Sequence, residues 1–444
     1  MVGNQARSVP GGGAVDSGER WISTDTWCFV TFALGFLLEA YIFGMAAIAT
    51  GWVKMPTSLR SLLLSWAPLW LIIGIAVAGP LADRVGRKTT FYLTMALYGV
   101  GVIGIVFSST YFLILFFLAI MLFAAGGEMN TIMAASHEVM PTRHRGKTMF
   151  FELNFINLGG VLLASISMLT AYQNVAFQRG MIAVLFVVVL FALFLARLRT
   201  PESIRWLEGR GATERARREA EKYYGAEQWA ARQEAAAQAN PDTLAIATRH
   251  VGDGLKYFTS ITIAFAGAAG FGLMTYVLGP AHFPKYTATI ILVATLVGFV
   301  SGLILAAVAD RFSRRWLLFI GYLGSFVITL LIAVAVPAWS ADLAFFWVLL
   351  VVLNLFVNIG YLTEDTLKSE VWPTKVRATR TAIVRFVSIA GYIATIYITQ
   401  SFSLTQYAYF SALIWAIGFA GALAWFASGT ETGKGLSLEV ASGE

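Results

Sequence analysis

The sequence predicts an all-α membrane protein whose twelve transmembrane helices form two halves. Hydrophobic residues make up 58% of the 444 residues and charged residues only 13%, which is too little charge to cover the surface of a soluble protein of this size. A helix needs about 20 apolar residues to cross the hydrocarbon core of a bilayer, and the chain contains many runs of that length. Two short motifs also occur twice, once in each half of the chain.

Each apolar run predicts one helix. The first six runs lie near residues 25–49, 61–82, 89–109, 111–137, 148–171 and 178–197. The next six, after a polar stretch, lie near residues 257–279, 287–309, 316–338, 341–367, 378–400 and 406–428. The chain thus divides into a tail (1–24), a six-helix half (25–198), a linker (199–256), a second six-helix half (257–428) and a short tail (429–444).

The polar stretch between the two halves is the only sizeable soluble segment. Its middle, residues 212–238, is rich in Ala, Glu and Arg and predicts a helix that lies along or beneath the membrane. We interpret the stretch as a linker, with a regulatory domain as the alternative.

Basic residues set the orientation of the helices, because cytoplasmic loops collect Lys and Arg. With the N-terminus inside, the cytoplasmic segments hold 27 of the 32 Lys and Arg residues, the outside loops hold four, and Arg385 lies within a span. We therefore expect both termini in the cytoplasm and the protein in the plasma membrane, the inner membrane of a bacterium. The first 24 residues contain no apolar core followed by a cleavage site, so we expect the first span to direct insertion.

Several functional classes are disfavoured by the composition. The basic residues are spread over short loops, which argues against a nucleic-acid-binding face. One cysteine, Cys28, is too few for a disulfide framework or a Cys-based metal cluster. The four histidines are scattered, with no nucleophile motif or phosphate-binding Gly loop beside them, so we expect no enzyme activity, no cofactor and no metal.

The two repeated motifs occupy equivalent loops of the two halves. LADRVGRK at 81–88 returns as VADRFSRR at 308–315, an offset of 227 residues. EVMPTRHR at 138–145 returns as EVWPTKVR at 370–377, an offset of 232 residues. This repetition supports a division into two related halves.

The stretch from Gly79 to Lys88 fills every position of G-x-L-A-D-R-x-G-R-K. The chain resembles the major facilitator superfamily of transporters, which carries this motif between its second and third helices. PESIRWL at 201–207 and ETGKG at 431–435 are similar to segments of the sugar porter branch. The resemblance implies two parallel six-helix halves related by an axis along the membrane normal, and transport by rocking of the halves about a central site.

In that family, charged residues on the cytoplasmic side form ion pairs that lock the inner gate. The resemblance assigns this role to Asp83, Arg84, Arg87, Glu138, Arg145, Glu202, Arg205, Asp310, Arg311, Glu370 and Arg377. The alternative is that these residues anchor loops at the interface, since an exposed ion pair is worth only about 0–1 kcal/mol.

Departures from the sugar porters concern the solute. Those proteins carry Gly-Arg in the fourth-helix motif and paired Gln in the seventh helix, where residues 265–276 (FAGAAGFGLMTY) contain no Gln. In that family these Gln side chains bind hexose hydroxyls, so their absence argues against a hexose. Together with Arg385 within a span, it favours a small organic acid or related polar metabolite, carried in symport with protons. A sugar, an organic cation and a non-transporting nutrient receptor are the alternatives. The expected partners are the solute, protons and the bilayer, and we expect a monomer.

Two acidic residues within the predicted spans are candidates for proton coupling. An ionisable residue in a span costs roughly 2.5–3.5 kcal/mol on insertion scales, so it needs a partner or a function. Glu39 lies in the middle of the first helix and Glu128 near the midplane of the fourth. A carboxylate in low-dielectric surroundings titrates closer to neutral pH than it does in water, as a proton carrier requires. A structural ion pair is the alternative for each.

The tenth helix has the clearest polar stripe. Asn354, Asn358, Tyr361 and Asp365 recur at i, i+4, i+7 and i+11, on one face of the helix. Amide and phenol groups on an otherwise apolar helix suit a binding site for a polar solute, and interhelical hydrogen bonding is the alternative. Glu364 points about a quarter-turn away and is assigned to the gate.

Three further residues complete the predicted substrate site. Arg385 is interpreted as the only basic residue within a span, where it could hold the carboxylate of a solute or of Glu39. Tyr392 follows it on nearly the same face. Asn154 in the fifth helix shares a face with Asn157, and an interhelical hydrogen bond is the alternative for one of these two amides.

Overall fold

The computed structural model describes residues 21–141, 145–230, 251–308, 311–372 and 377–432. The secondary structure of these residues is entirely helical. Twelve helical segments within these ranges are long and apolar enough to cross a membrane, with mean hydropathies between 1.6 and 2.9. The predicted all-α membrane protein with twelve spans is therefore confirmed.

The first half of the chain consists of six long helices. They are α1 (Ser23–Ala49), α2 (Thr57–Val85), α3 (Arg87–Phe107), α4 (Tyr111–Val139), α5 (Arg145–Leu169) and α6 (Val175–Leu198). Two short helices follow in the linker, α7 (Ile204–Gly209) and α8 (Thr213–Tyr223). The helix predicted near 212–238 is represented by α8, and residues 231–250 lie outside the described part of the chain.

The second half begins with a span that contains a π-helical turn. It runs through α10 (Asp253–Gly272), the π-helical turn η3 (Leu273–Val277) and α11 (Leu278–His282). The remaining elements are η4 (Pro284–Tyr286), α12 (Thr287–Val308), α13 (Arg314–Val334), α14 (Val336–Trp339), α15 (Leu343–Glu370), α16 (Arg377–Ile398), η6 (Thr399–Ser401) and α17 (Leu404–Ser428). A π-turn inside a long helix is a local widening that is frequent at functional sites.

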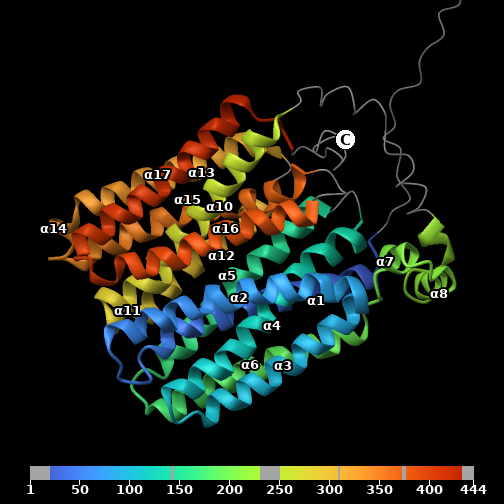
Figure 1. Ribbon diagram of the computed structural model, residues 1–444, viewed down its shortest axis with the longest axis horizontal. Helices are drawn as coiled ribbons and strands as arrows, with labels where there is room; N and C mark the ends of the chain where they lie inside the picture. Colours follow the sequence, from blue (N-terminus) through green and yellow to red (C-terminus); the bar gives the residue numbers. More distant parts are fainter. Residues whose placement is uncertain (1–20, 142–144, 231–250, 309–310, 373–376, 433–444) are drawn as a thin grey trace, which may run out of the picture.

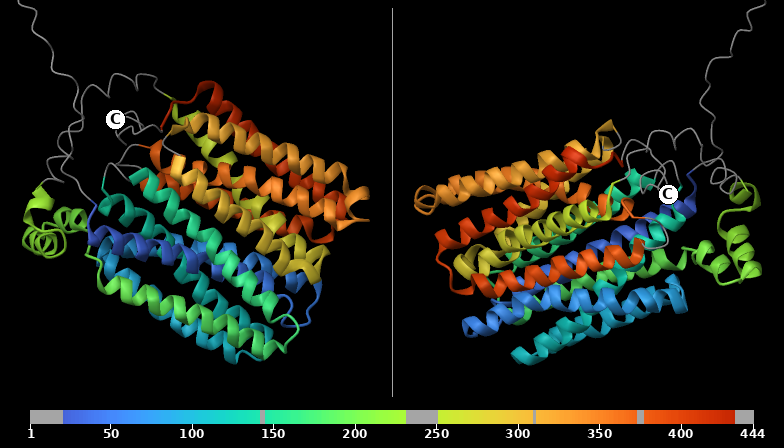
Figure 2. Two further views of the ribbon diagram at one scale, coloured as in Figure 1. Left: turned by 180° about the vertical axis from the view of Figure 1, so that it is seen from behind. Right: turned by 45° about the horizontal axis from the view of Figure 1, so that its top comes forward.

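The two halves lie side by side with their helices roughly along the long axis of the molecule (Figures 1 and 2). The same helix pairs pack in each half: α1 against α5 corresponds to α10 against α16, and α3 against α4 corresponds to α13 against α15. The halves meet where α5 packs on α12 and α2 packs on α16. Helices α7 and α8 lie at one end of the bundle, which we call the charged-turn end because the Gly86 turn is there (Figure 1).

Glycine allows helices within a half to approach closely. A Cβ atom added to Gly126 on α4 would lie 2.0 Å from the carbonyl oxygen of Leu71 on α2. A Cβ atom added to Gly74 on α2 would lie 2.1 Å from the carbonyl oxygen of Phe123 on α4. Small residues therefore set the α2–α4 distance, as expected where dense packing replaces the hydrophobic effect inside a bilayer.

Burial separates central helices from peripheral ones. In an apolar 18-residue stretch of α1, 89% is buried within the protein, whereas in the corresponding stretch of α6 only 33% is buried. The outer helices expose large apolar side chains, such as Phe107 on α3 and Val188 on α6. A polar side chain on α1 thus points into the protein, whereas the outer face of α6 suits contact with lipid.

Candidate transport site

The turn between α2 and α3 lies beside several residues that the sequence assigns to the gate. Gly86 has a φ of 99°, a conformation that glycine adopts without strain. The Glu202 carboxylate accepts a hydrogen bond of 3.0 Å from the backbone N–H of Arg87, and so caps α3. The Arg87 guanidinium lies 3.2 Å from Glu138, whose carboxylate also accepts a hydrogen bond from Ser203. The structure thus brings Arg87, Glu138 and Glu202 together at the charged-turn end.

The second half repeats this cap. The Glu431 carboxylate accepts a hydrogen bond of 2.8 Å from the backbone N–H of Arg314, at the start of α13, and another from Ser313. Glu202 and Glu431 each follow the last long helix of their half, so the two segments that resemble sugar porter motifs have equivalent positions.

The other predicted gating residues are only partly described. The side chains of Arg84 and Arg311 are exposed, and the carbonyl of Arg84 accepts a hydrogen bond from Arg210. The following side chains lie outside the described residues: Asp83, Arg145, Arg205, Asp310, Glu370 and Arg377.

A cavity of about 190 Å³ lies between the halves. Its wall is formed by α1, α2, α4 and α5 of the first half and by α10, η3, α12, α13, α15, α16 and α17 of the second. Since one water needs roughly 10–15 Å³ on this measure, the cavity has room for on the order of a dozen waters or for one small metabolite. The wall is mostly apolar and carries a few polar groups, as small-molecule sites do.

The polar stripe of α15 lines this cavity. Asn354, Asn358, Tyr361 and Asp365 all belong to its wall, as does Tyr392 on α16. Asn354 donates a hydrogen bond of 2.8 Å to the carbonyl of the preceding helical turn. Asn358 donates to the carbonyl of Gly298 on α12 at 2.9 Å. The stripe therefore faces the cavity and, through Asn358, also fixes α15 against α12, and its role in binding a solute stays a prediction.

Asn154 occupies a different place from the predicted one. Its side chain is fully buried outside the cavity wall and donates a hydrogen bond of 2.9 Å to the carbonyl of Phe299 on α12. Its neighbour Asn157 lines the cavity and donates to Asn358 at 3.1 Å. Both amides thus form an interhelical hydrogen bond, Asn154 to α12 and Asn157 to α15, and of the two Asn157 is the one that also lies in the cavity wall.

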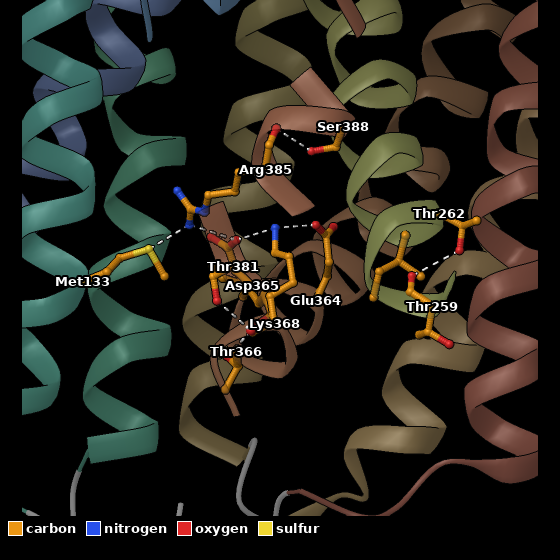
Figure 3. A network of polar contacts seen from close by, with 12 residues as sticks. Met133, Thr259, Thr262, Glu364, Asp365, Thr366, Lys368, Thr381, Arg385 and Ser388 are labelled. Atoms are coloured by element: carbon orange, nitrogen blue, oxygen red, sulfur yellow. Dashed lines mark hydrogen bonds and ion pairs between the residues drawn. The ribbon is translucent and has the colours of Figure 1, made fainter. Parts of the chain in front are cut away.

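Four charged residues form a network in the cavity wall, which we call the α15–α16 charge cluster (Figure 3). Lys368 Nζ lies 2.6 Å from Glu364 Oε1 and 2.8 Å from Asp365 Oδ1. Arg385 Nη2 lies 3.6 Å from the same Asp365 oxygen. All four side chains are at least nine-tenths buried. The cluster contains two carboxylates and two cations, so it is neutral when every member is ionised.

Two members of this cluster correct the sequence analysis. Glu364, assigned there to the gate, lies in the cavity wall. Lys368 was not recognised, because the predicted helix ended at residue 367, whereas α15 continues to Glu370. The signal was present in the spacing, since acids four and three residues before a lysine share a helix face with it.

Arg385 reaches across the interface between the halves. Its guanidinium lies 3.2 Å from the thioether sulfur of Met129 and 2.8 Å from that of Met133, both on α4. Thioethers are weak hydrogen-bond acceptors. Among the described residues, the guanidinium thus has one strong acceptor, Asp365, on one side, and its other side faces the first half.

Glu39 is the carboxylate that the first half presents to the cavity. Its side chain on α1 is 8% exposed and forms part of the wall. Its Oε2 atom has no hydrogen-bond partner among the described residues. The charges that act on it include Arg385 and Asp365 across the cavity and Glu128 in its own half. Burying a carboxylate with an oxygen that lacks a partner costs free energy, so the role of Glu39 as a proton carrier stays a prediction that its position in the wall allows.

Glu128 has a counterion instead. Its carboxylate forms an ion pair with Arg197 on α6 and accepts a hydrogen bond of 2.9 Å from Thr94, and both members of the pair are 1% exposed. Glu128 does not belong to the cavity wall. Arg197 also corrects the interpretation of Arg385 as the only basic residue in a span, because α6 buries Arg197 at what was taken to be its cytoplasmic end. This arrangement favours the structural alternative for Glu128.

The comparisons with known proteins agree with this architecture. A family model described as Major Facilitator Superfamily matches residues 26–396. The chain belongs to the Major Facilitator Superfamily. It is accordingly an integral membrane transporter and not an enzyme.

Individual relatives of this superfamily member transport sugars or metabolites. The chain is 30% identical over 192 residues to a probable metabolite transport protein of Bacillus subtilis, covering 42% of this chain and 41% of that protein. It is 32% identical over 197 residues to a D-xylose transporter of Levilactobacillus brevis, covering 43% and 42%. The chain thus matches about two fifths of the length of these curated relatives. The solved structure of the proton:xylose symporter XylE covers 95% of this chain and 99% of its own, with 20% identity and a TM-score of 0.73, and so shares the fold.

Proposed function

We propose that this transporter carries a neutral polyhydroxylated solute, such as a monosaccharide, together with protons. The solute would occupy the central cavity, which opens alternately to the two sides of the membrane as the halves rock. The transporter would act as a monomer in the plasma membrane with both termini in the cytoplasm, in keeping with the bias of Lys and Arg and with a cavity formed within one chain.

The proposal of proton coupling rests on the position of Glu39. It is a buried carboxylate in the cavity wall, and its Oε2 atom lacks a hydrogen-bond partner among the described residues. Protonation would remove an uncompensated charge from the wall, and deprotonation would restore attraction to Arg385. The protonation state of Glu39 would thereby alter the interaction between the halves, which is what coupling requires.

The charge of the wall supports a neutral solute. Three carboxylates (Glu39, Glu364 and Asp365) face two cations (Lys368 and Arg385) among the described residues of the wall. Both cations lie within ion-pair distance of Asp365, so a solute carboxylate would compete with a carboxylate already in place. Two of the relatives are a glucose transporter and a D-xylose transporter, whereas one, a niacin transporter, carries an organic acid, so we propose a sugar in place of the organic acid favoured by the sequence.

The charged-turn end supports a gating role for its ion pairs. Glu138 is 22% exposed and Arg87 is 11% exposed, so their interaction is partly shielded from water and stronger than that of a fully exposed pair. Because this contact joins the Gly86 turn to the end of α4, rocking that separates these elements would break it.

Transport assays on the purified protein in liposomes test the proposal. A pH-sensitive dye inside the liposomes would report proton movement on addition of D-xylose, D-glucose, sorbitol, nicotinate, lactate or choline, one at a time. We expect acidification with a sugar or polyol only. Acidification with a carboxylate or choline would overturn the solute class, and radiolabelled sugar uptake without proton movement would overturn the coupling.

A conservative substitution tests Glu39 itself. Glu39→Gln should abolish accumulation driven by a pH gradient while leaving exchange of sugar across the membrane, because exchange moves no net proton. Glu152→Gln is the matched control, since Glu152 is also buried in the first half but lies outside the cavity wall and binds Ser136 at 2.7 Å. Full accumulation by Glu39→Gln would remove Glu39 as the proton carrier.

A further inference from the structure

The cavity wall contains a second carboxyl group, that of Glu364, whose hydrogen-bond contacts bear on its protonation state. Tyr322 on α13 has its hydroxyl oxygen 2.8 Å from the carbonyl oxygen of Ile263 on α10 and 2.7 Å from Oε2 of Glu364 on α15. A phenol has one hydrogen to donate, and a backbone carbonyl can only accept. If the phenol donates to Ile263, its contact with Glu364 is a hydrogen bond only when the carboxyl group donates.

The other oxygen of Glu364 is engaged as an acceptor. Lys368 Nζ donates to Oε1 of Glu364 at 2.6 Å, so one carboxyl oxygen accepts from an ammonium group while the other faces the phenol. With the phenol hydrogen on Ile263, this is the pattern of a protonated carboxyl group, with a carbonyl-like Oε1 and a hydroxyl-like Oε2; with that hydrogen on Glu364, both oxygens accept, as in a carboxylate. The side chain is 3% exposed and lies in the cavity wall.

The charge balance of the wall independently indicates that one of its carboxyl groups is protonated. The described wall has one carboxylate more than it has cations. An uncompensated charge in a low-dielectric site is costly, so one proton is needed for neutrality. Asp365 is ruled out as its first location, because Lys368 and Arg385 both lie within ion-pair distance of its Oδ1 atom. Glu39 and Glu364 remain.

We infer that Glu364 is a second protonation site of the cavity, held by Tyr322 and Lys368 in the second half and opposite Glu39 in the first. The groups that face it are Lys368, Asp365 and Tyr361 from α15 and Tyr322 from α13. Helix α10 presents the carbonyl of Ile263 and Gly267, where an added Cβ would lie 2.4 Å from Glu364 Oε2.

This site deepens the proposed function, on which its role in transport rests. The two carboxyl groups lie on opposite halves, so the half that holds the proton can differ from one conformation to the other. When Glu364 loses its proton, the α15–α16 charge cluster becomes neutral by itself (Figure 3). When Glu364 gains one, the cluster carries one positive charge, which attracts an ionised Glu39 across the cavity.

Infrared difference spectroscopy of the purified full-length protein tests the site without any solute. We expect the spectrum of the unsubstituted protein minus that of Glu364→Gln, at neutral pH, to contain the carbonyl band of a protonated carboxylic acid. That band should disappear at high pH. It should persist when the same subtraction is made with Glu39→Gln present in both proteins. A difference spectrum at neutral pH that contains only carboxylate bands would overturn the inference.

A second variant keeps the test valid if Glu364→Gln does not fold. Tyr322→Phe retains the carboxyl group and removes its hydrogen-bond partner, so the protonated-acid band should shift in frequency. An unshifted spectrum would show that no protonated carboxyl group contacts Tyr322, which contradicts the inference. Because neither measurement uses a sugar, failure of the sugar assay and failure of this assay are distinguishable.

Discussion

Replacement of Arg197 by Gln should strongly destabilise the first half. The guanidinium forms an ion pair with Glu128 and donates to the carbonyl of Phe91 at 2.8 Å, and both ionic side chains are 1% exposed. Removing one partner of such a pair costs about 3–5 kcal/mol, because the other charge is left buried. The Thr94 hydroxyl would still donate to the Glu128 carboxylate, which would have lost its counterion.

Thermal unfolding in detergent measures this cost. For a unit of 150–250 residues, 1 kcal/mol corresponds to roughly 2–4 °C in Tm, so Arg197→Gln should lower Tm by roughly 6–20 °C. The control is Arg217→Gln on α8. Arg217 and Glu214 are 67% and 71% exposed, and such pairs contribute about 0–1 kcal/mol. The control should therefore change Tm little.

A double substitution separates the loss of the pair from the unpaired charge. Replacing both Arg197 and Glu128 by Met removes both charges, and this is often neutral or stabilising for a buried pair. The double variant should therefore be more stable than Arg197→Gln alone. The reasoning is refuted if Arg197→Gln unfolds at the temperature of the unsubstituted protein, or if the double variant is the least stable of the three.

Two other predictions follow from packing. Gly126→Val should lower the free energy of unfolding by about 1–3 kcal/mol or more, because the new side chain meets the Leu71 carbonyl. The control Gly99→Val on α3 should be tolerated, since a Cβ atom there has nothing within 4 Å. Equal Tm values for the two variants would contradict the close packing of α2 and α4. Asn154→Ala should lower stability by about 0.5–1.5 kcal/mol with little effect on the KM for sugar, since it removes the hydrogen bond that joins α5 to the Phe299 carbonyl of α12. Asn354→Ala, in the cavity wall, should instead raise KM by about tenfold, equivalent to about 1.4 kcal/mol, and the reverse pattern would show that the two amides have been assigned to the wrong faces.

Local sequence patterns determined the architecture. Twelve helices follow from the length of the apolar runs, because a bilayer allows no exposed backbone polar groups and a spanning segment satisfies them internally as a helix. The stripe on α15 follows from helical phase, since residues four and seven apart share a face wherever the helix lies. The mid-span position of Glu39 marked it in the same way as a residue in need of a partner or a function.

Tertiary structure alone decided which polar groups are paired. Glu39 and Glu128 look alike in sequence, but Arg197, 69 residues from Glu128, neutralises only one of them. Asn154 and Asn157 share a face of α5, yet one meets the backbone of α12 and the other meets the cavity. The contact of Glu364 with Tyr322 joins residues 42 positions apart. Helical phase gives the direction of each side chain relative to its own helix, whereas the choice between a counterion, a backbone carbonyl and a cavity depends on which helix packs against that face.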